Sequence, residues 1–146
     1  MNEAIEDFIP HRGPMRLVDR LIAADDEAAT VEADVPSEGR LVRDGRMPAY
    51  VGIELMAQAV AAWAGARARR AGAAPRTGYL LGTRRFEARC AGFEAGTTLR
   101  IDVRCELIGD AGLGMFDCAI VQAGDTLATA RISVYEPREE APAQIP

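Results

Sequence analysis

The sequence of 146 residues is poor in the residues that bind metals or form covalent enzyme intermediates. Histidine occurs once, as His11, which is too little for a conventional metal site. The only serines, Ser37 and Ser133, lie outside any Gly-x-Ser-x-Gly motif, which argues against a serine hydrolase. An odd number of cysteines at wide spacings predicts neither a disulfide framework nor a zinc site, and is typical of small core residues. These cysteines are Cys90, Cys105 and Cys118.

Long apolar runs and excess positive charge are also missing. The longest apolar stretch, 50–66, is interrupted by Glu54 and Gln58, so it predicts a buried helix and no membrane span. The net charge of −5 disfavours nucleic acids and anionic membranes as partners, because both attract a cationic protein. The acidic amino terminus lacks a basic region followed by an apolar run, so we expect no targeting peptide and a cytoplasmic protein.

The first half of the chain predicts two strands and one long helix. An apolar run over 15–24 and an alternating segment over 28–35 are expected to pair around a turn at 25–27. A charged, glycine-rich loop over 36–46 follows. Because Pro48 suits a first helical turn and Gly72 a helix end, we expect a helix over about 48–71.

The second half predicts strands alone. Apolar and charged residues alternate strictly over 98–107, which is the clearest strand in the chain. Glycine-rich turns separate it from expected strands at 78–89, 114–122 and 126–135, and the four are expected to form an antiparallel meander.

These elements predict a single α+β domain over residues 1–136, followed by a flexible tail over 137–146. The helix is apolar nearly all round, so a single curved antiparallel sheet must wrap it on several sides.

Glu54 is a lone carboxylate in an otherwise apolar, alanine-rich helix start, Met47-Pro-Ala-Tyr-Val-Gly-Ile-Glu-Leu-Met-Ala-Gln58. Burial of an unpaired carboxylate is costly and would raise its pKa, so the segment is typical of the acid/base end of an active site. With the upstream motif Ile9-Pro-His-Arg-Gly-Pro-Met-Arg-Leu-Val-Asp-Arg20, it resembles the hot-dog fold (3R)-hydroxyacyl-acyl-carrier-protein dehydratases.

The resemblance implies a hot-dog domain that pairs edge to edge with a second one, with active sites at the interface. It further implies a 3-hydroxyacyl thioester of acyl carrier protein or coenzyme A as substrate, with no cofactor. Glu54 matches the catalytic carboxylate of that family, and Gln58, one turn further, is expected to orient it. Ala49 occupies the position of a glycine whose amide binds the thioester oxygen. Tyr50 and Gly52 complete the expected substrate-binding residues of this segment.

The chain departs from the family at the histidine that lies fourteen residues before the carboxylate, where it has Arg40. Arginine is no proton base at neutral pH. His11 either takes over as the base or is a structural residue of its turn. Without the usual histidine, the sequence is most similar to the divergent dehydratase subunits of aryl-polyene clusters, whose partners can include a second hot-dog dehydratase.

Three alternatives remain open. The chain could be a non-catalytic partner in a heterodimer with an active hot-dog subunit, instead of an active homodimer. It could be a hot-dog thioesterase, in which the same carboxylate activates water. Glu54 could also form a buried ion pair with Arg43 or Arg46.

Arginines in an otherwise acidic chain predict a dock for an acidic carrier protein. We expect Arg84 and Arg85, with Arg67 or Arg70, to line the entrance. The alternative is that they pair with neighbouring strand carboxylates such as Glu87.

Overall fold

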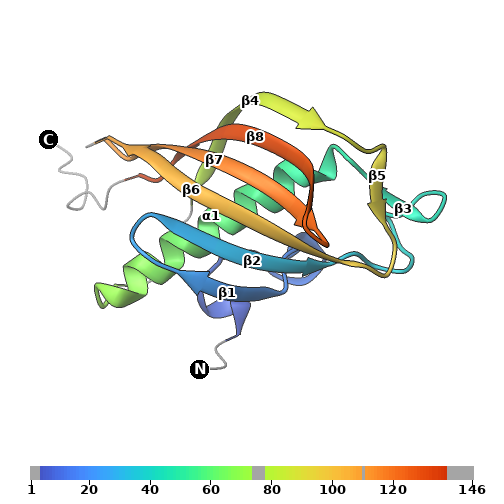
Figure 1. Cartoon of the computed structure of the whole chain (residues 1–146). Coiled ribbons are helices and arrows are strands. Elements are labelled where there is room, and N and C mark those ends of the chain that lie inside the picture. Colours follow the sequence, from blue (N-terminus) through green and yellow to red (C-terminus); the bar gives the residue numbers. More distant parts are fainter. Residues whose placement is uncertain (1–3, 74–77, 110, 138–146) are drawn as a thin grey trace, which may run out of the picture.

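One helix lies against a curved antiparallel sheet in the computed structural model, which describes residues 4–73, 78–109 and 111–137. The helix is α1 (Val51–Arg70). The sheet contains, in spatial order, β1 (Arg20–Ala24), β2 (Ala28–Asp34), β6 (Thr98–Ile108), β7 (Leu113–Gln122), β8 (Asp125–Tyr135) and β4 (Tyr79–Ala88). A separate pair is formed by β3 (Arg46–Pro48) and β5 (Gly92–Glu94). This is the expected hot-dog arrangement of one long helix wrapped by a sheet (Figure 1). The predicted tail lies outside the described residues except for Pro137.

The core fills the space between the sheet and the helix. Alternate residues of β6, namely Leu99, Ile101 and Val103, are fully buried against it, as their alternation predicted. The helix contributes the buried residues Leu55, Met56, Ala59 and Trp63 to the same core. One stripe of the helix escapes this packing and stays half-buried: Glu54, Ala57, Ala61 and Ala64. The sheet therefore covers most of the helix and leaves one face open.

Two sequence predictions need correction. The sequence predicts a loop and a helix start at residues 46–48 and a turn at residues 92–94. In the structure these segments pair as β3 and β5, with Met47 opposite Phe93. The helix consequently begins at Val51 and not at Pro48. The second correction concerns the meander, because β4 pairs with β8 and has no pairing with β6. The segment between β4 and β6 pairs with β3 instead of turning tightly, which allows β4 to reach the far edge of the sheet.

The strand β4 leaves one long edge of the sheet without a partner among the described strands. Its side chains Tyr79, Leu80 and Leu81 are exposed large hydrophobic residues. An unpaired edge of ten residues with apolar side chains favours pairing with another strand. In the described residues, no helix has the length and apolarity needed to cross a membrane.

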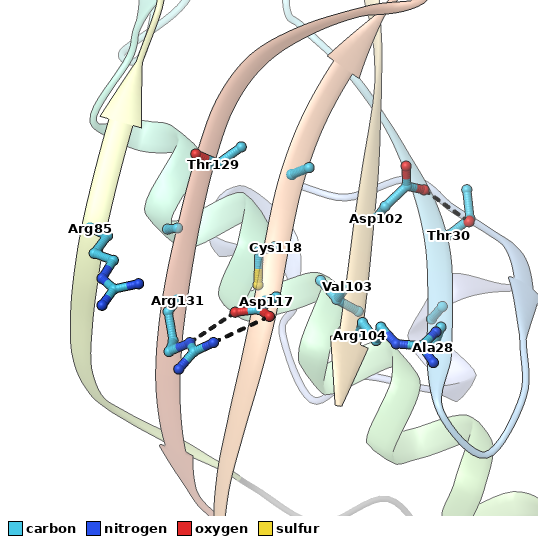
Figure 2. Close-up of a pocket in the computed structure, with 13 residues that line it drawn as sticks. Ala28, Thr30, Arg85, Asp102, Val103, Arg104, Asp117, Cys118, Thr129 and Arg131 are labelled. Carbon is cyan, nitrogen blue, oxygen red and sulfur yellow. Dashed lines mark hydrogen bonds and ion pairs between the residues drawn. The ribbon is translucent and has the colours of Figure 1, made fainter. Parts of the chain in front are cut away.

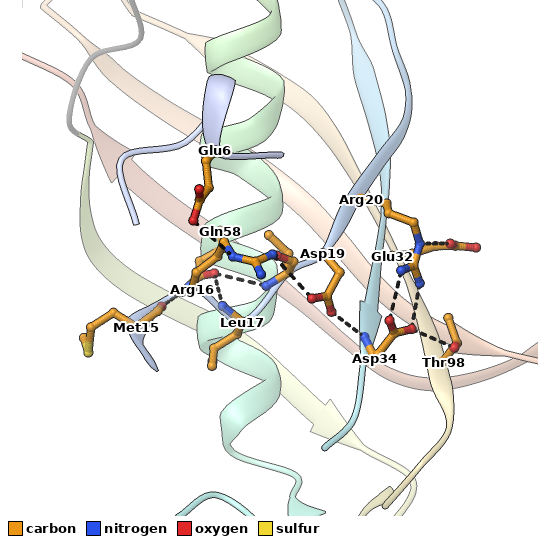
Figure 3. A network of polar contacts seen from close by, with 11 residues as sticks. Glu6, Met15, Arg16, Leu17, Asp19, Arg20, Glu32, Asp34, Gln58 and Thr98 are labelled. Atoms are coloured by element: carbon orange, nitrogen blue, oxygen red, sulfur yellow. Dashed lines mark hydrogen bonds and ion pairs between the residues drawn. The ribbon is translucent and has the colours of Figure 1, made fainter. Parts of the chain in front are cut away.

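A polar network joins the amino-terminal segment to the sheet (Figure 3). Arg16 donates to the carbonyl oxygen of Val18 and reaches Asp19, and Asp19 accepts a hydrogen bond of 2.7 Å from the amide of Asp34. Arg20 donates two hydrogen bonds to the Asp34 carboxylate. These contacts give the Leu-Val-Asp-Arg motif a structural role, because they fix the chain that leads to the helix face.

Candidate active site

The amino-terminal segment reaches the open face of α1 because Gly65 has no side chain. A Cβ atom at this position would collide with the backbone carbonyl of Phe8. The close approach buries Ile5, Phe8 and Ile9 in the core, and it brings the following Pro10 and His11 along the helix toward its start.

Arg12 holds the turn that carries His11. Its guanidinium donates to the carbonyl oxygens of Ile9 at 2.6 Å, of His11 at 2.8 Å and of Glu6 at 2.8 Å. These hydrogen bonds satisfy the carbonyl groups of a short irregular segment and fix its path. Arg12 is therefore a structural residue of the Pro-His-Arg motif.

Gln58 holds the Glu54 carboxylate and is itself fully buried. Its amide oxygen accepts hydrogen bonds from the backbone N–H groups of Leu17 at 2.8 Å and Val18 at 3.3 Å. Its amide nitrogen donates to the carbonyl oxygen of Met15 at 2.7 Å and to Oε2 of Glu54 at 2.9 Å. The amide thus fixes both the incoming chain and the rotamer of Glu54 (Figure 3 shows Gln58 with Met15, Arg16 and Leu17).

His11 lies beside the same carboxylate oxygen. Its Nε2 atom is 3.9 Å from Oε2 of Glu54, so both groups can reach one small reactant. The Nδ1 atom is buried and has no hydrogen-bond partner among the described residues. The catalytic role of His11 remains a prediction.

Glu54 is less buried than the sequence suggested, because its side chain is 46% exposed. The expected burial of a lone carboxylate is therefore absent in the single chain. Nor does Glu54 pair with Arg43 or Arg46, which together line a separate hollow beside Pro48. Its partners within the described part of the chain are His11 and Gln58.

Glu54 and His11 line a cavity of about 210 Å³ on the open face of α1, which we call the Glu54 cavity. Its walls come from three parts of the chain: the amino-terminal segment, α1, and the start of β4 with the end of β8. Tyr79 and Leu80 line it from the unpaired edge strand, outside the two motifs that predicted the catalytic residues. Alternating apolar residues at a strand edge give no local signal of such a contact.

The start of α1 presents backbone donors, but not at the predicted residue. The N–H group of Ala49 donates to the carbonyl oxygen of Ala91 at 3.2 Å, so it is already occupied. The N–H groups of Tyr50 and Val51 have no acceptor in the part of the chain that the structure describes. They lie one turn before Glu54 at the positive end of the helix dipole, where an oxyanion is favoured.

The other predicted substrate-binding residues differ in their surroundings. Tyr50 is 64% exposed just before α1 begins, so its side chain is accessible. Gly52 is buried, and a Cβ atom there would press on Phe93 and Ile120. The absence of a side chain at Gly52 therefore serves the packing of the helix start on the sheet. Contact of either residue with a substrate remains a prediction.

The arginines predicted to form one entrance lie in different places. Arg85 has a positive φ of 54° at an irregularity of β4. Figure 2 shows its side chain on the same face as Arg131 and Asp117, where these residues line a groove of about 680 Å³. This outer groove lies on the face of the sheet that points away from α1. Arg84 is exposed on β4, opposite Arg131 in the ladder.

The two helix arginines also separate. Arg67 lines a second cavity further along α1, with its guanidinium 5.4 Å from the centre of the Trp63 ring. Arg70 forms an ion pair of 3.0 Å with Asp26. The four arginines therefore form no single rim in the isolated chain, and carrier-protein docking at Arg84 and Arg85 remains a prediction.

A known protein family matches nearly the whole chain. Residues 3–145 match the ApeP-like family, described as ApeP dehydratase. The chain belongs to the ApeP-like dehydratase family. This agrees with the hot-dog dehydratase resemblance drawn from the Met-Pro and Pro-His-Arg motifs. Among curated proteins, none matches the chain significantly.

Solved structures support the same assignment. The dehydratase heterocomplex ApeI:P from Xenorhabdus doucetiae is similar with a TM-score of 0.87 and 29% identity, over 95% of this ApeP-like chain and 94% of that one. A hypothetical thioesterase with coenzyme A from Streptococcus pneumoniae has a TM-score of 0.63 and 17% identity, over 80% and 84% of the two chains. The Escherichia coli PaaI protein has a TM-score of 0.62 and 21% identity, over 79% and 80%. The latter two share the fold.

Proposed function

We propose that this chain is one subunit of a dehydratase that removes water from 3-hydroxyacyl thioesters, with Glu54 as the acid and His11 as the base. The observation that carries the proposal is the 3.9 Å separation of His11 Nε2 and Glu54 Oε2 at the Glu54 cavity. Two proton-transfer groups at this spacing can act on neighbouring carbon atoms of one substrate.

The proposed reaction transfers one proton in each direction. His11 Nε2 removes the proton from C2 of the acyl chain, and the electron pair of that bond forms the C2–C3 double bond. The C3–O bond breaks, and the departing oxygen takes the proton of the Glu54 carboxyl group and leaves as water. Transfer of the proton from His11 to Glu54 then restores the starting state.

Backbone donors at the start of α1 would stabilise the negative charge that develops on the thioester oxygen. The free N–H groups of Tyr50 and Val51 are available for this purpose. The Gln58 amide holds Glu54 in one orientation by its 2.9 Å hydrogen bond, which lowers the cost of positioning the acid.

A partner subunit on the edge of β4 would complete the site. Tyr79 and Leu80 belong to this unpaired edge and also line the Glu54 cavity, so a strand added to β4 would cover the cavity from that side. Covering it would remove water from a carboxylate that is 46% exposed in the single chain. The name of the ApeI:P heterocomplex supports a second hot-dog subunit as this partner. The acyl carrier is either acyl carrier protein or coenzyme A.

A subunit that only supports an active partner is the second candidate, and the occupied Ala49 amide and Arg40 favour it. Arg40 is exposed and is not among the residues that line the Glu54 cavity. In this case the histidine of the partner would act, and His11 would be dispensable.

The experiment is turnover of a 3-hydroxyacyl-pantetheine by the tagged chain, purified from its native cells with and without the subunit that copurifies. We expect an enoyl product that disappears in Glu54→Gln and falls sharply in His11→Asn. Wild-type turnover of the complex by His11→Asn would favour the second candidate. Release of a free thiol without enoyl product would instead indicate a thioesterase and contradict the dehydratase proposal.

A further inference from the structure

Arg43 and Arg46 lie side by side on a tight hairpin. Each donates its backbone N–H to the carbonyl oxygen of the other, at 2.8 Å and 3.1 Å. Asp44 and Gly45, between them, have positive φ values of 54° and 76°, as the two central residues of a type I′ turn require. Directly opposite residues of an antiparallel pair extend their side chains to the same face, with Cβ atoms about 5 Å apart. The turn therefore places two arginines on one face, and we call it the arginine hairpin.

The arginine hairpin is fixed to the rest of the fold. The carbonyl oxygen of Gly45 accepts a hydrogen bond of 2.9 Å from the amide of Ala95, and Arg46 continues into β3, which pairs with β5. The aliphatic part of Arg46 packs over Gly92, where a Cβ atom would lie 3.2 Å from its Cδ atom. These contacts set the position of the hairpin in advance of any ligand, which lowers the cost of binding one.

The guanidinium groups of Arg43 and Arg46 have no ion-pair partner among the residues that the structure describes. Asp44 lies in the same turn and Glu94 lies opposite Arg46 in the ladder, but neither forms an ion pair with them. Arginines on other surfaces pair with carboxylates instead, for example Arg20, Arg70, Arg104 and Arg131. Because like charges directly opposite each other destabilise a hairpin, an anion held between the two arginines would relieve their repulsion.

A hollow of the right kind for an anion lies at the arginine hairpin. It has a volume of about 290 Å³, and both arginines line it together with Asp44, Pro48 and Ala91. Guanidinium groups bind phosphate through two parallel N–H donors, a geometry that a point charge does not offer. Figure 1 shows β3, which follows the hairpin, beside the start of α1. The hollow and the catalytic carboxylate therefore belong to the same end of the helix.

The hollow lies within reach of Glu54. Pro48, which lines it, is three residues before the helix start at Val51, and Glu54 is three residues further. The Cα atoms of Pro48 and Glu54 are at most about 16 Å apart, because three residues span about 11 Å when extended and about 4.5 Å in a helix. The pantetheine arm has about thirteen bonds between its phosphorus and its sulfur, or about 16 Å when extended. One arm can therefore place its phosphate in the hollow and its thioester at Glu54.

We propose that Arg43 and Arg46 bind the phosphate group at the end of the pantetheine arm, and that they thereby select phosphorylated carriers of the substrate. Acyl carrier protein and coenzyme A both present this group. The inference rests on the proposed function for the position of the thioester at Glu54. It deepens that function, because it assigns carrier selection to a hairpin outside the Glu54 cavity.

The test is an NMR titration of 4′-phosphopantetheine and of pantetheine into the full chain with its copurifying subunit, at one ionic strength. Neither compound can be dehydrated, so the measurement is independent of turnover. We expect the phosphorylated compound to bind about tenfold more tightly or better, since one hydrogen bond to a charged group is worth at least that factor. Arg43→Gln/Arg46→Gln should lose this preference and bind pantetheine as wild type does.

Matched variants separate the arginine hairpin from the general charge of the protein. Arg100→Gln/Arg104→Gln makes the same change at exposed positions of β6, where the arginines pair with Asp102 and Glu27. It removes the same charge and should keep the wild-type preference. Arg43→Lys/Arg46→Lys keeps the charge without the planar fork and should retain part of the preference. Circular dichroism and the thermal midpoint verify that all three variants fold.

Equal affinity of the wild type for the two compounds would overturn the proposal, and would mean that Asp44 or Glu94 neutralises the arginines in solution. It also fails if both glutamine variants lose the preference to the same extent. Inorganic phosphate that binds as tightly as 4′-phosphopantetheine would indicate a site for the free ion and would overturn it as well. Glu54→Gln should keep the phosphate preference, so the hairpin assignment and the dehydratase proposal can fail separately.

Discussion

The outer groove of the sheet and the Glu54 cavity differ in size and in how their polar groups are paired. The outer groove is the larger, at about 680 Å³ against about 210 Å³. Several of its polar groups are paired within the groove, since Arg131 donates to Asp117 at 2.9 Å and Asp102 accepts a hydrogen bond from Thr30 at 3.0 Å (Figure 2). In the smaller cavity, the buried Nδ1 of His11 has no partner among the described residues.

We take the held Glu54 carboxylate beside an imidazole, and not the cavity volume, as the mark of the proposed site. Ion pairs on the outer face hold their own geometry and leave little for a ligand to satisfy. The Glu54 cavity combines a held carboxylate with a nearby imidazole, and under the proposed function a substrate would contact both. The following experiments test whether the two faces differ in function as they differ in pairing.

The largest expected effect is on catalysis. Glu54→Gln keeps an oxygen for the Gln58 hydrogen bond but removes the proton donor, so we expect turnover of the complex to fall by about 10²–10⁴-fold. Asp117→Asn makes the same chemical change in the outer groove and should retain wild-type turnover. A comparable loss in both variants, at equal folding, would refute the assignment of the site to the inner face.

A large effect on stability is expected from the Gln58 amide. Gln58→Leu leaves the buried N–H of Val18 and the part-buried N–H of Leu17 without their acceptor, which costs about 1–3 kcal/mol for each group that water cannot reach. Denaturant unfolding measures the loss. Arg131→Met removes an exposed ion pair of the outer face and should leave the unfolding midpoint nearly unchanged. A larger loss of stability in Arg131→Met than in Gln58→Leu would contradict the stabilising role of the Gln58 hydrogen bonds.

A smaller effect is expected where the amino-terminal segment meets the helix. Gly65→Ala forces the carbonyl of Phe8 away from α1 and should cost about 1–3 kcal/mol, with a loss of activity because His11 moves with the segment. Gly82→Ala in β4 adds the same methyl group where no atom lies within 4 Å. Thermal unfolding and turnover of both variants provide the comparison, and equal midpoints would disprove the close contact.

The smallest expected effect is the acid response of the ion pair between Arg20 and Asp34. The hydrogen bonds from Arg20 hold the pKa of Asp34 below its ordinary value of 3.8. Stability from this group is therefore complete above about pH 4 and is lost as the pH falls through the lowered pKa. Because the pair is largely exposed, it contributes only about 0–1 kcal/mol. Between about pH 6 and about pH 2, the free energy of unfolding should fall more steeply with decreasing pH for wild type than for Asp34→Asn. Parallel curves would exclude the linkage.

Local patterns predicted most of the fold. The strict alternation over 98–107 became β6 (Thr98–Ile108), and Gly72 ends the helix with a positive φ of 75°. The same local reasoning missed β3 and β5, because strands of three residues bury too few side chains to show a period. It also missed the position of Arg85, since an irregularity of β4 alters which face a side chain occupies.

The candidate site also contains contacts that local patterns predict and contacts that they do not. Glu54 and Gln58 are four residues apart on one helix, so their meeting follows from the sequence through helical geometry alone. His11 meets Glu54 only because Gly65 admits the backbone of Phe8 and because Gln58 ties the chain at Met15. Likewise, the Glu54 cavity depends on walls from the amino-terminal segment and the edge strand β4. The sequence by itself determined the local pair and the elements that carry it. Only the tertiary structure decided what surrounds them, since contacts between distant segments depend on the packing of the whole chain.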